Sequence, residues 1–246
     1  MAALKNRVLH QTGHVLHTLP YRETSLIIEA FTREHGRVAL MAKGARRPHS
    51  SLRGVIMEFQ PLEFSWSGQG ELKTLTHCEW LGGQALLRGR ALMFAYYMNE
   101  LLLRLLPRED AHPALFDHYA ATLAALSIQA DAADEVLLRR FEHALLRELG
   151  YGLHIEHCAD SDESIQPVRH YHYEIERGLI HADLRQGAVD GRLYISGRTL
   201  IALQADDYSE AETRQQSKQL MRMLLNHYLN GQPLQARRVF KELQEL

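Results

Sequence analysis

Residues 36–54 hold the part of the sequence whose residue types most clearly predict a chemical role. Between Arg33 and Arg53 the chain carries six cations and a single acid, Glu34. Holding so many like charges close together costs self-repulsion, which a phosphate backbone relieves while it releases its own counterions. The segment therefore predicts a nucleic-acid contact, and a solvated loop that is basic by chance is the alternative.

A nucleic-acid contact on this segment needs cations for the phosphates and exposed rings for the bases. We expect the phosphate contacts to come from Arg37, Lys43, Arg46, Arg47 and Arg53, with Lys73 extending the track. Tyr21 and Trp66 fall at predicted turns, where an exposed ring can stack on a base for on the order of 1–3 kcal/mol. For both rings, packing in a core is the alternative.

Catalytic chemistry finds little support in the sequence. The clearest grouping of base, nucleophile and acid is His157-Cys158-Ala159-Asp160, and neighbours along the chain do not form a triad in space. The sequence contains neither a phosphate-binding loop nor a dinucleotide-binding fingerprint, so no cofactor is predicted. We therefore predict a protein that is not an enzyme. A hydrolase built around Cys158 is a further hypothesis, which loss of activity in Cys158→Ala would reveal.

The elements that must position the cations are strands in the first third of the chain. Alternation of apolar and polar residues, interrupted by turn residues, predicts five strands at 8–19, 25–32, 37–43, 55–66 and 71–80. Five short strands joined by tight turns favour a small closed barrel, since closure removes exposed sheet edges. We expect an OB-fold at residues 1–81, and a five-stranded SH3-like barrel is the alternative.

Helical periodicity replaces this alternation after Gly82-Gly83. Helices are expected at 85–106, 113–127, 132–149, 197–205, 209–229 and 233–246. Residues 151–195 return to short strands with charge and glycine. The fold class is therefore α+β, in which an N-terminal barrel precedes a helical domain at 82–246. Its helices lie at about 85–150 and 196–246, with a small mixed insertion at 151–195.

Composition limits where nucleic acid can bind and where the protein works. The chain of 246 residues is 46% hydrophobic and 24% charged, with a formal net charge of −2. Binding to a polyanion must therefore come from local segregation of charge. No apolar run reaches the roughly 18 residues that span a bilayer. The N-terminus does not resemble a signal peptide, and two cysteines make no disulfide framework. We expect a cytoplasmic protein without a membrane partner.

Several short motifs, taken in order, resemble those of the RecO family of bacterial recombination mediators. They are Glu23-Thr24-Ser25-Leu26, Phe31-Thr32, Gly36-Arg37, Ala42-Lys43-Gly44-Ala45-Arg46, Ser51-Leu52, Gly70-Glu71-Leu72, Thr74-Leu75, Asn99-Glu100-Leu101-Leu102, Arg139-Arg140-Phe141-Glu142 and Leu149-Gly150-Tyr151. They cover nearly the whole chain. The resemblance implies an N-terminal OB-fold and a helical domain that carries a small insertion.

The same resemblance implies a function in recombinational DNA repair. Proteins of this family bind single- and double-stranded DNA, anneal complementary strands, and act on DNA coated by single-strand-binding protein so that the RecA recombinase can load. The implied partners are DNA, the C-terminal tail of single-strand-binding protein, RecR and RecA, and the implied location is the nucleoid. An OB-fold RNA-binding module is the alternative, which dependence on the ribose 2′-hydroxyl would distinguish.

The resemblance also implies that the helical domain receives the acidic, phenylalanine-ended tail of single-strand-binding protein. Such a tail needs an apolar slot for the ring and an arginine for the terminal carboxylate. The expected residues are Arg139, Arg140, Leu137 and Phe141. Arg139 is the first choice for the carboxylate, and an intrahelical ion pair with Glu142 or Glu135 is the alternative. Adjacent helical residues point about 100° apart, so at most one of the two arginines borders a groove.

Many relatives, by the same resemblance, hold zinc in the insertion with two C-x-x-C pairs. Here Cys158 occupies the first place, but Ser161 stands at the second, and the later pair is replaced by His181 and Leu184. One thiol with scattered imidazoles does not make a closed tetrahedral site, so no metal is predicted. The insertion must then be held by packing, with expected contributions from Tyr171, Tyr173, Ile175, Leu179 and Ile180.

Overall fold

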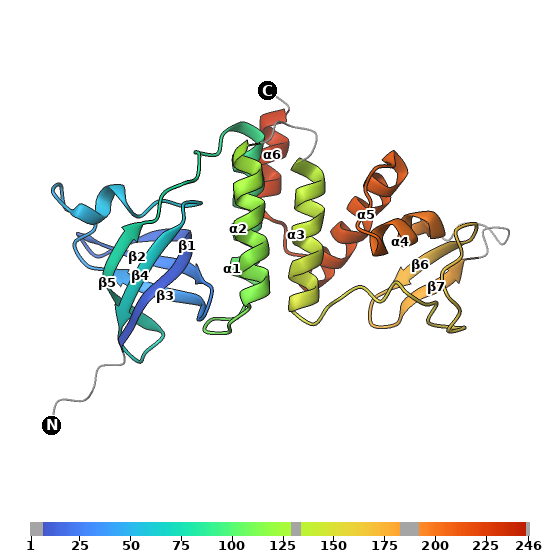
Figure 1. Cartoon of the computed structure of the whole chain (residues 1–246), viewed down its shortest axis with the longest axis horizontal. Helices are drawn as coiled ribbons and strands as arrows, with labels where there is room; N and C mark the ends of the chain where they lie inside the picture. The colour runs from blue at the N-terminus through green and yellow to red at the C-terminus, as the bar shows by residue number, and fades with distance from the viewer. Residues whose placement is uncertain (1–6, 129–133, 183–191, 245–246) are drawn as a thin grey trace. The chain divides into compact units, whose positions relative to one another are not determined.

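A computed structural model describes residues 7–128, 134–182 and 192–244 (Figure 1). Contacts between residues divide the chain into two compact units. The first unit comprises Met1–Asp134 and Leu234–Leu246, and the second comprises Glu135–Pro233. The sequence predicts a domain boundary after residue 81, whereas these units group the first two helices and the last helix with the strands. That predicted boundary stays a prediction.

Five strands of the first unit close into a barrel. They are β1 (Arg7–Tyr21), β2 (Ser25–Thr32), β3 (Gly36–Ala42), β4 (Leu62–Ser67) and β5 (Leu72–Trp80). Their order around the barrel is β1-β2-β3-β5-β4, and β1 pairs with β4 to close it. All neighbours are antiparallel except β3 and β5, which run parallel. The closed five-stranded barrel confirms the predicted OB-fold.

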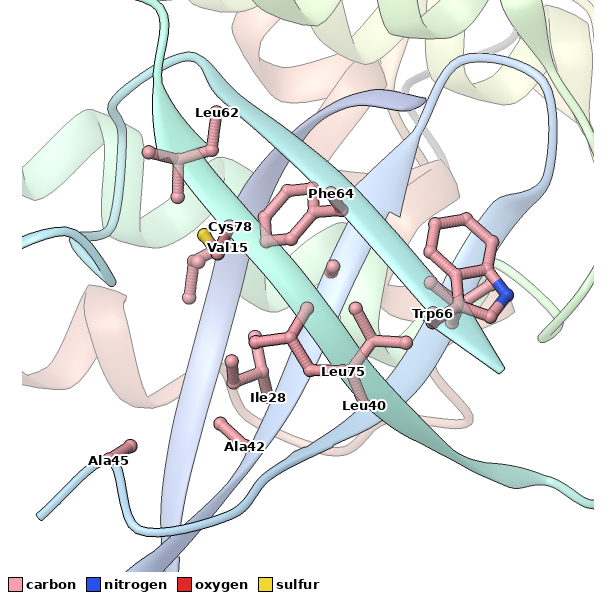
Figure 2. Close-up of a cluster of buried hydrophobic side chains, with 12 residues drawn as sticks. Val15, Ile28, Leu40, Ala42, Ala45, Leu62, Phe64, Trp66, Leu75 and Cys78 are labelled. Carbon is pink, nitrogen blue, oxygen red and sulfur yellow. The ribbon is translucent and has the colours of Figure 1, made fainter. Parts of the chain in front are cut away.

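The barrel interior is filled by the apolar residues that alternate along its strands. Val15, Ile28, Leu40, Phe64 and Trp66 belong to this core, as Figure 2 shows. Trp66 is only 1% exposed. The proposal that this indole stacks on bases is therefore wrong, and its alternative, packing in the core, is correct. Tyr21 is half-buried and lies under the guanidinium of Arg22, 5.2 Å from the ring centroid.

The fourth strand is shorter than predicted, because it begins at Leu62 rather than at residue 55. A short 3₁₀ helix, η1 (Ser51–Gly54), precedes it, and the Ser50 hydroxyl accepts a hydrogen bond from the Leu52 amide to cap η1. Val55 and Ile56 pack against the barrel core from outside the strand ladder. These two apolar residues therefore anchor a loop. The alternation of apolar and polar residues does not by itself distinguish such a loop from a strand.

Three helices complete the first unit: α1 (Gly89–Leu105), α2 (Pro113–Ile128) and α6 (Gln235–Gln244). Asn99 of α1 is buried, donates to the carbonyl of Leu16 in β1 at 2.8 Å, and accepts from the Tyr119 hydroxyl of α2 at 2.6 Å. One amide thus joins a strand and two helices with its polar atoms satisfied. The sequence places the start of α1 at residue 85, but α1 begins at Gly89, and residues 81–88 form a connection without regular secondary structure.

Helix α6 is attached to α1 through the backbone amides at its N-terminus. The carboxylate of Glu100 in α1 accepts from the amides of Gln235 and Ala236, each at 2.9 Å. The amides of a helix N-terminus lack partners within the helix and favour negative charge. The Arg237 side chain then donates to the Tyr97 hydroxyl at 3.0 Å. Glu100 therefore fixes where the last helix begins.

The second unit joins helices to a small sheet. Its elements are α3 (Asp134–Glu148), β6 (His170–Glu174), β7 (Gly178–Ala182), β8 (Tyr194–Ser196), α4 (Gly197–Gln204) and α5 (Ala211–Tyr228). The strand order is β7-β6-β8. Ser196 caps α4, as the sequence predicts, because its hydroxyl accepts from the Thr199 amide. In the described part of the chain, no helix combines the length and apolar character needed to span a bilayer.

Packing inside the insertion involves the predicted residues. Tyr171 and Leu179 are buried, whereas Tyr173, Ile175 and Ile180 are half-buried. Cys158 is buried, and its thiol donates to the Asp160 carboxylate at 2.9 Å. Desolvation raises the pKa of this thiol. Leu184 lies outside the described residues.

His14 links the stability of the first unit to pH. This β1 residue is 2% exposed and packs against the rings of Phe116 and Tyr119, and burial lowers its pKa to about 4. An unfolded histidine binds a proton near pH 6.5, so stability is complete above that pH and falls as the pH drops toward 4. The loss from this group is roughly 3 kcal/mol.

Denaturant unfolding as a function of pH measures this contribution. We expect His14→Gln to flatten the decline between pH 6.5 and 4, because a neutral amide does not titrate. His118→Gln, at an exposed position, should keep the wild-type profile. Identical profiles for wild type and His14→Gln would contradict the assignment.

Candidate nucleic-acid interface

The basic loop between β3 and β4 is ordered by its own backbone. The Arg46 amide donates to the Thr24 carbonyl at 2.9 Å, and the Arg47 amide donates to the Gly44 carbonyl at 3.0 Å. Gly44 has a φ of +70°, which a side chain would strain. Ala45 is buried in the barrel core, so the loop is attached to the barrel at its first turn. Its cations therefore project from a fixed backbone.

Four of the six predicted phosphate contacts are exposed on or beside this loop. Lys43, Arg46, Arg47 and Arg53 are all exposed, and within the described ranges none has a carboxylate at ion-pair distance. Arg46 only donates to the Arg22 carbonyl, at 3.4 Å. We call Lys43, Arg46, Arg47 and Arg53 the loop cations. Acidic side chains at ion-pair distance do not offset the mutual repulsion of these cations in the described part of the chain. A surface of this kind attracts a polyanion.

The other two predicted contacts, Arg37 and Lys73, are held by acids. The Arg37 guanidinium lies 3.6 Å from the Glu29 carboxylate, and burial lowers the pKa of this guanidinium. Lys73 is buried, and its ammonium lies 2.5 Å from the Glu109 carboxylate. Because both charges are already neutralised within the protein, they are poor phosphate ligands.

Glu109, the partner of Lys73, comes from the loop between α1 and α2, and the same loop supplies Arg108 as a second cation for Glu29. The Glu109 amide donates to the Arg37 carbonyl at 2.9 Å, and the Arg108 guanidinium binds Glu29. A Cβ atom on Gly36 would lie 1.9 Å from the Asp110 carbonyl oxygen, so only glycine permits this approach. No local pattern predicts this contact, because the loop between α1 and α2 is far along the chain from β3.

An exposed aromatic residue that the sequence did not single out is Trp80, the last residue of β5. Its side chain is 56% exposed, and its indole nitrogen donates to the Gln60 side chain at 3.3 Å. Trp80 pairs with Leu62, the first residue of β4, where the basic loop segment ends. A ring fixed at one edge and open on its surface can stack on a base. The sequence feature that could have indicated its exposure is its position at the end of the strand, just before Gly82-Gly83.

The two arginines predicted to bind a partner tail differ in environment. Arg139 of α3 is buried, and its guanidinium lies 2.6 Å from the carboxylate of Glu142, which is fully buried. The intrahelical alternative is therefore present. Arg140 is exposed and lies 2.9 Å from the Asp206 carboxylate, with its guanidinium 5.9 Å from the Tyr208 ring centroid.

The apolar residues predicted beside them are less accessible than a binding slot requires. Phe141 is fully buried, and Leu137 is half-buried. Phe141 and Tyr208 are therefore buried in the second unit, whereas Leu137 remains a half-buried neighbour of the arginines. The opposite environments of Arg139 and Arg140 follow from the 100° rotation between adjacent helical residues.

These features define an OB-fold protein with an ordered basic loop, followed by helices and a small inserted sheet. Residues 7–84 match the family described as Recombination protein O N terminal, and residues 87–238 match Recombination protein O C terminal. The chain therefore belongs to the RecO family.

Curated relatives agree over almost the full length. The chain is 58% identical over 242 residues to DNA repair protein RecO of Aromatoleum aromaticum, covering 98% of this chain and 99% of the relative. It is 52% identical over 244 residues to DNA repair protein RecO of an Azoarcus species, covering 99% and 100%. The RecO family resemblance drawn from the motifs is confirmed.

The Lys73–Glu109 pair should matter for folding rather than for DNA. We expect Glu109→Gln to lower the free energy of unfolding by about 1–3 kcal/mol, because it leaves the buried ammonium with only the Gly70 carbonyl; half-exposure of Glu109 keeps the loss below that of a fully buried pair. Glu34→Gln, in the exposed pair with Arg33, is the matched control and should change stability little. Denaturant unfolding measures both, and equal effects would contradict a structural role.

Proposed function

We propose that this protein is a DNA-binding recombination mediator in DNA repair and not an enzyme. The observation that carries the proposal is the set of loop cations, which stand exposed and unpaired on an ordered loop of an OB-fold barrel. The relatives are DNA repair proteins by name, which supports DNA rather than RNA as the polymer. Binding to chromosomal DNA would associate the protein with the nucleoid.

Recognition of this kind is largely indifferent to sequence. Lysine and arginine contacts to phosphates position a strand but carry no base information, and stacking on Trp80 accepts any base. The same cations can neutralise two strands at once, which lowers the repulsion between complementary strands. Annealing of single strands, and binding of duplex DNA, then follow from one surface.

Mediation additionally requires the protein to reach DNA that is already coated. We propose that the second unit holds the acidic C-terminal tail of single-strand-binding protein, so that the barrel acts at a high effective concentration on the coated strand. The loop cations then compete locally for phosphates and open DNA for loading of RecA, with RecR as a further partner.

Arg140 is better placed than Arg139 to take the terminal carboxylate of that tail. Its partner Asp206 is exposed, and exposed ion pairs are worth about 0–1 kcal/mol, so an incoming carboxylate can replace Asp206 at little cost. Removing Arg139 from Glu142 would instead leave a buried carboxylate without its cation. The half-buried side chain of Leu137, three residues before Arg140 and on the same side of α3, supplies apolar surface for the terminal phenylalanine.

The loop cations set the salt dependence of DNA binding. If they neutralise roughly four phosphates of a single strand, log K should fall with log salt at a slope near −2.8. We expect replacement of all four by glutamine to bring the slope close to zero and to abolish annealing, as measured by fluorescence anisotropy with an oligonucleotide of mixed sequence.

A matched variant tests whether position or net charge matters. Arg88, Arg198, Lys218 and Arg222 are exposed cations outside the loop. Their joint replacement by glutamine makes the same change in net charge and should retain most of the slope. Equal losses in the two quadruple variants would contradict the proposed interface.

Tail binding distinguishes the two arginines. We expect Arg140→Ala to weaken binding of a peptide with the acidic, phenylalanine-ended sequence by roughly tenfold or more, because a charge-assisted bidentate contact is lost. Calorimetry with the full-length protein measures the affinity. Asp206→Asn should strengthen binding, since it frees the guanidinium.

The control removes Arg139 without leaving its partner charged. The double variant Arg139→Met, Glu142→Leu replaces the buried pair by apolar residues of similar size, which the fold should tolerate. It should bind the peptide as wild type does. Loss of binding in this variant, with no change in Arg140→Ala, would return the assignment to Arg139.

A further inference from the structure

A cluster of histidine and glutamate side chains lies on the outside of the barrel, on strands β4 and β5. Glu63 of β4 and Glu79 of β5 are directly paired across the two strands, and His77 lies two residues before Glu79. Residues two apart along a strand share a face, so His77 and Glu79 point the same way. Carboxylates placed opposite each other repel, and this arrangement is destabilising without a cation between them.

The ligand atoms of this cluster already lie close to the spacing of a metal site. The imidazole Nε2 of His77 is 3.4 Å from a carboxylate oxygen of Glu79 and 4.0 Å from one of Glu63, and all three ligand atoms fall within 4.8 Å of one another. Bonds of about 2.1 Å in a tetrahedral site separate the ligand atoms by about 3.4 Å. One pair matches this spacing, and the others need only small side-chain movements.

A third strand orients one of these carboxylates. Where β1 pairs with β4, its register is broken between Val8 and Gln11, and His10 adopts a positive φ of 53°. The His10 amide donates to the Ser65 hydroxyl at 3.1 Å, and its imidazole Nδ1 lies 2.8 Å from the Glu63 carboxylate. The bulge therefore turns His10 toward Glu63. Hydrogen bonds of this kind fix the direction of ligating carboxylates in metal sites.

We propose that Glu63, His77 and Glu79 bind a divalent first-row transition metal, with zinc as the best match, and that His10 positions Glu63. A ligand set of one imidazole and two carboxylates suits such an ion better than a set of oxygen ligands alone. Three protein ligands leave a fourth position for water. The ion would neutralise the opposed carboxylates and tie β4 to β5 beside the seam with β1.

This site is distinct from the insertion, for which no metal is predicted. Its residues lie on two strands, with the orienting histidine on a third, so only His77 and Glu79 are close in sequence, and that pair alone is not a recognised metal motif. In the described insertion, the Cys158 thiol is instead bonded to Asp160. A zinc ion found on this protein should therefore depend on the barrel residues and not on Cys158.

Calorimetric titration of zinc chloride into metal-free, full-length protein tests the site. We expect one zinc per chain, a raised melting temperature with zinc, and loss of both effects in His77→Gln and in Glu63→Gln. His10→Ala should weaken binding by about 10- to 100-fold, as expected for a positioning residue. His118→Gln and Cys158→Ser should bind as wild type does.

Two results would overturn the proposal. The first is zinc binding that survives His77→Gln and Glu63→Gln unchanged or is lost in Cys158→Ser, which would place the ion elsewhere. The second is equal competition by magnesium, which would indicate a site for cations that prefer oxygen ligands. Circular dichroism of each variant without metal separates loss of the site from loss of the fold.

Discussion

Ion pairs between the barrel and the loop that joins α1 to α2 determine which cations of the barrel are available to bind a ligand. A charge removed from water must have a partner, or its burial costs several kcal/mol. Arg108 and Glu109 meet this requirement for Glu29 and Lys73. The barrel cations thereby fall into two sets: those paired with acids inside the fold, and the loop cations, which have no carboxylate at ion-pair distance in the described part of the chain. In the proposed function, a phosphate backbone would supply the negative charge that the loop cations lack.

Polar contacts also decide how the helices of the first unit attach to the barrel. Asn99 satisfies a strand carbonyl and a tyrosine hydroxyl, and Glu100, its neighbour on α1, caps the first amides of α6. Apolar surfaces alone pack in several ways, whereas a buried amide accepts few arrangements in which all of its hydrogen bonds are made. Two adjacent residues of α1 therefore fix a strand, a second helix and the C-terminal helix.

Local rules predicted much of the fold, because alternation, glycine turns and caps act over a few residues. The cap at Ser196 and the strand from Ser25 to Thr32 follow directly from such rules. Trp66 was misassigned because a ring at the end of a strand faces the core or solvent according to the closure of the barrel. Lys73 is neutralised by Glu109 from a loop distant in sequence, and Arg37 by Glu29 of the neighbouring strand β2, so alternation along one strand revealed neither pair. The same limit hid the cluster of Glu63, His77 and Glu79, which strand register alone brings together.

The proposed division of roles between the two units would place different demands on the loop cations and on Arg140. A DNA contact needs cations without internal partners, because each competing acid would have to be displaced at every step along the strand. A tail contact tolerates an exposed partner such as Asp206, because one exchange of carboxylates suffices and costs little in water. Under the proposed mechanism, tethering through the tail would raise the local concentration of the barrel, provided that the linkage spans both sites. The proposed mediation would therefore require a basic loop that is rigid on its barrel and a tail site that is accessible.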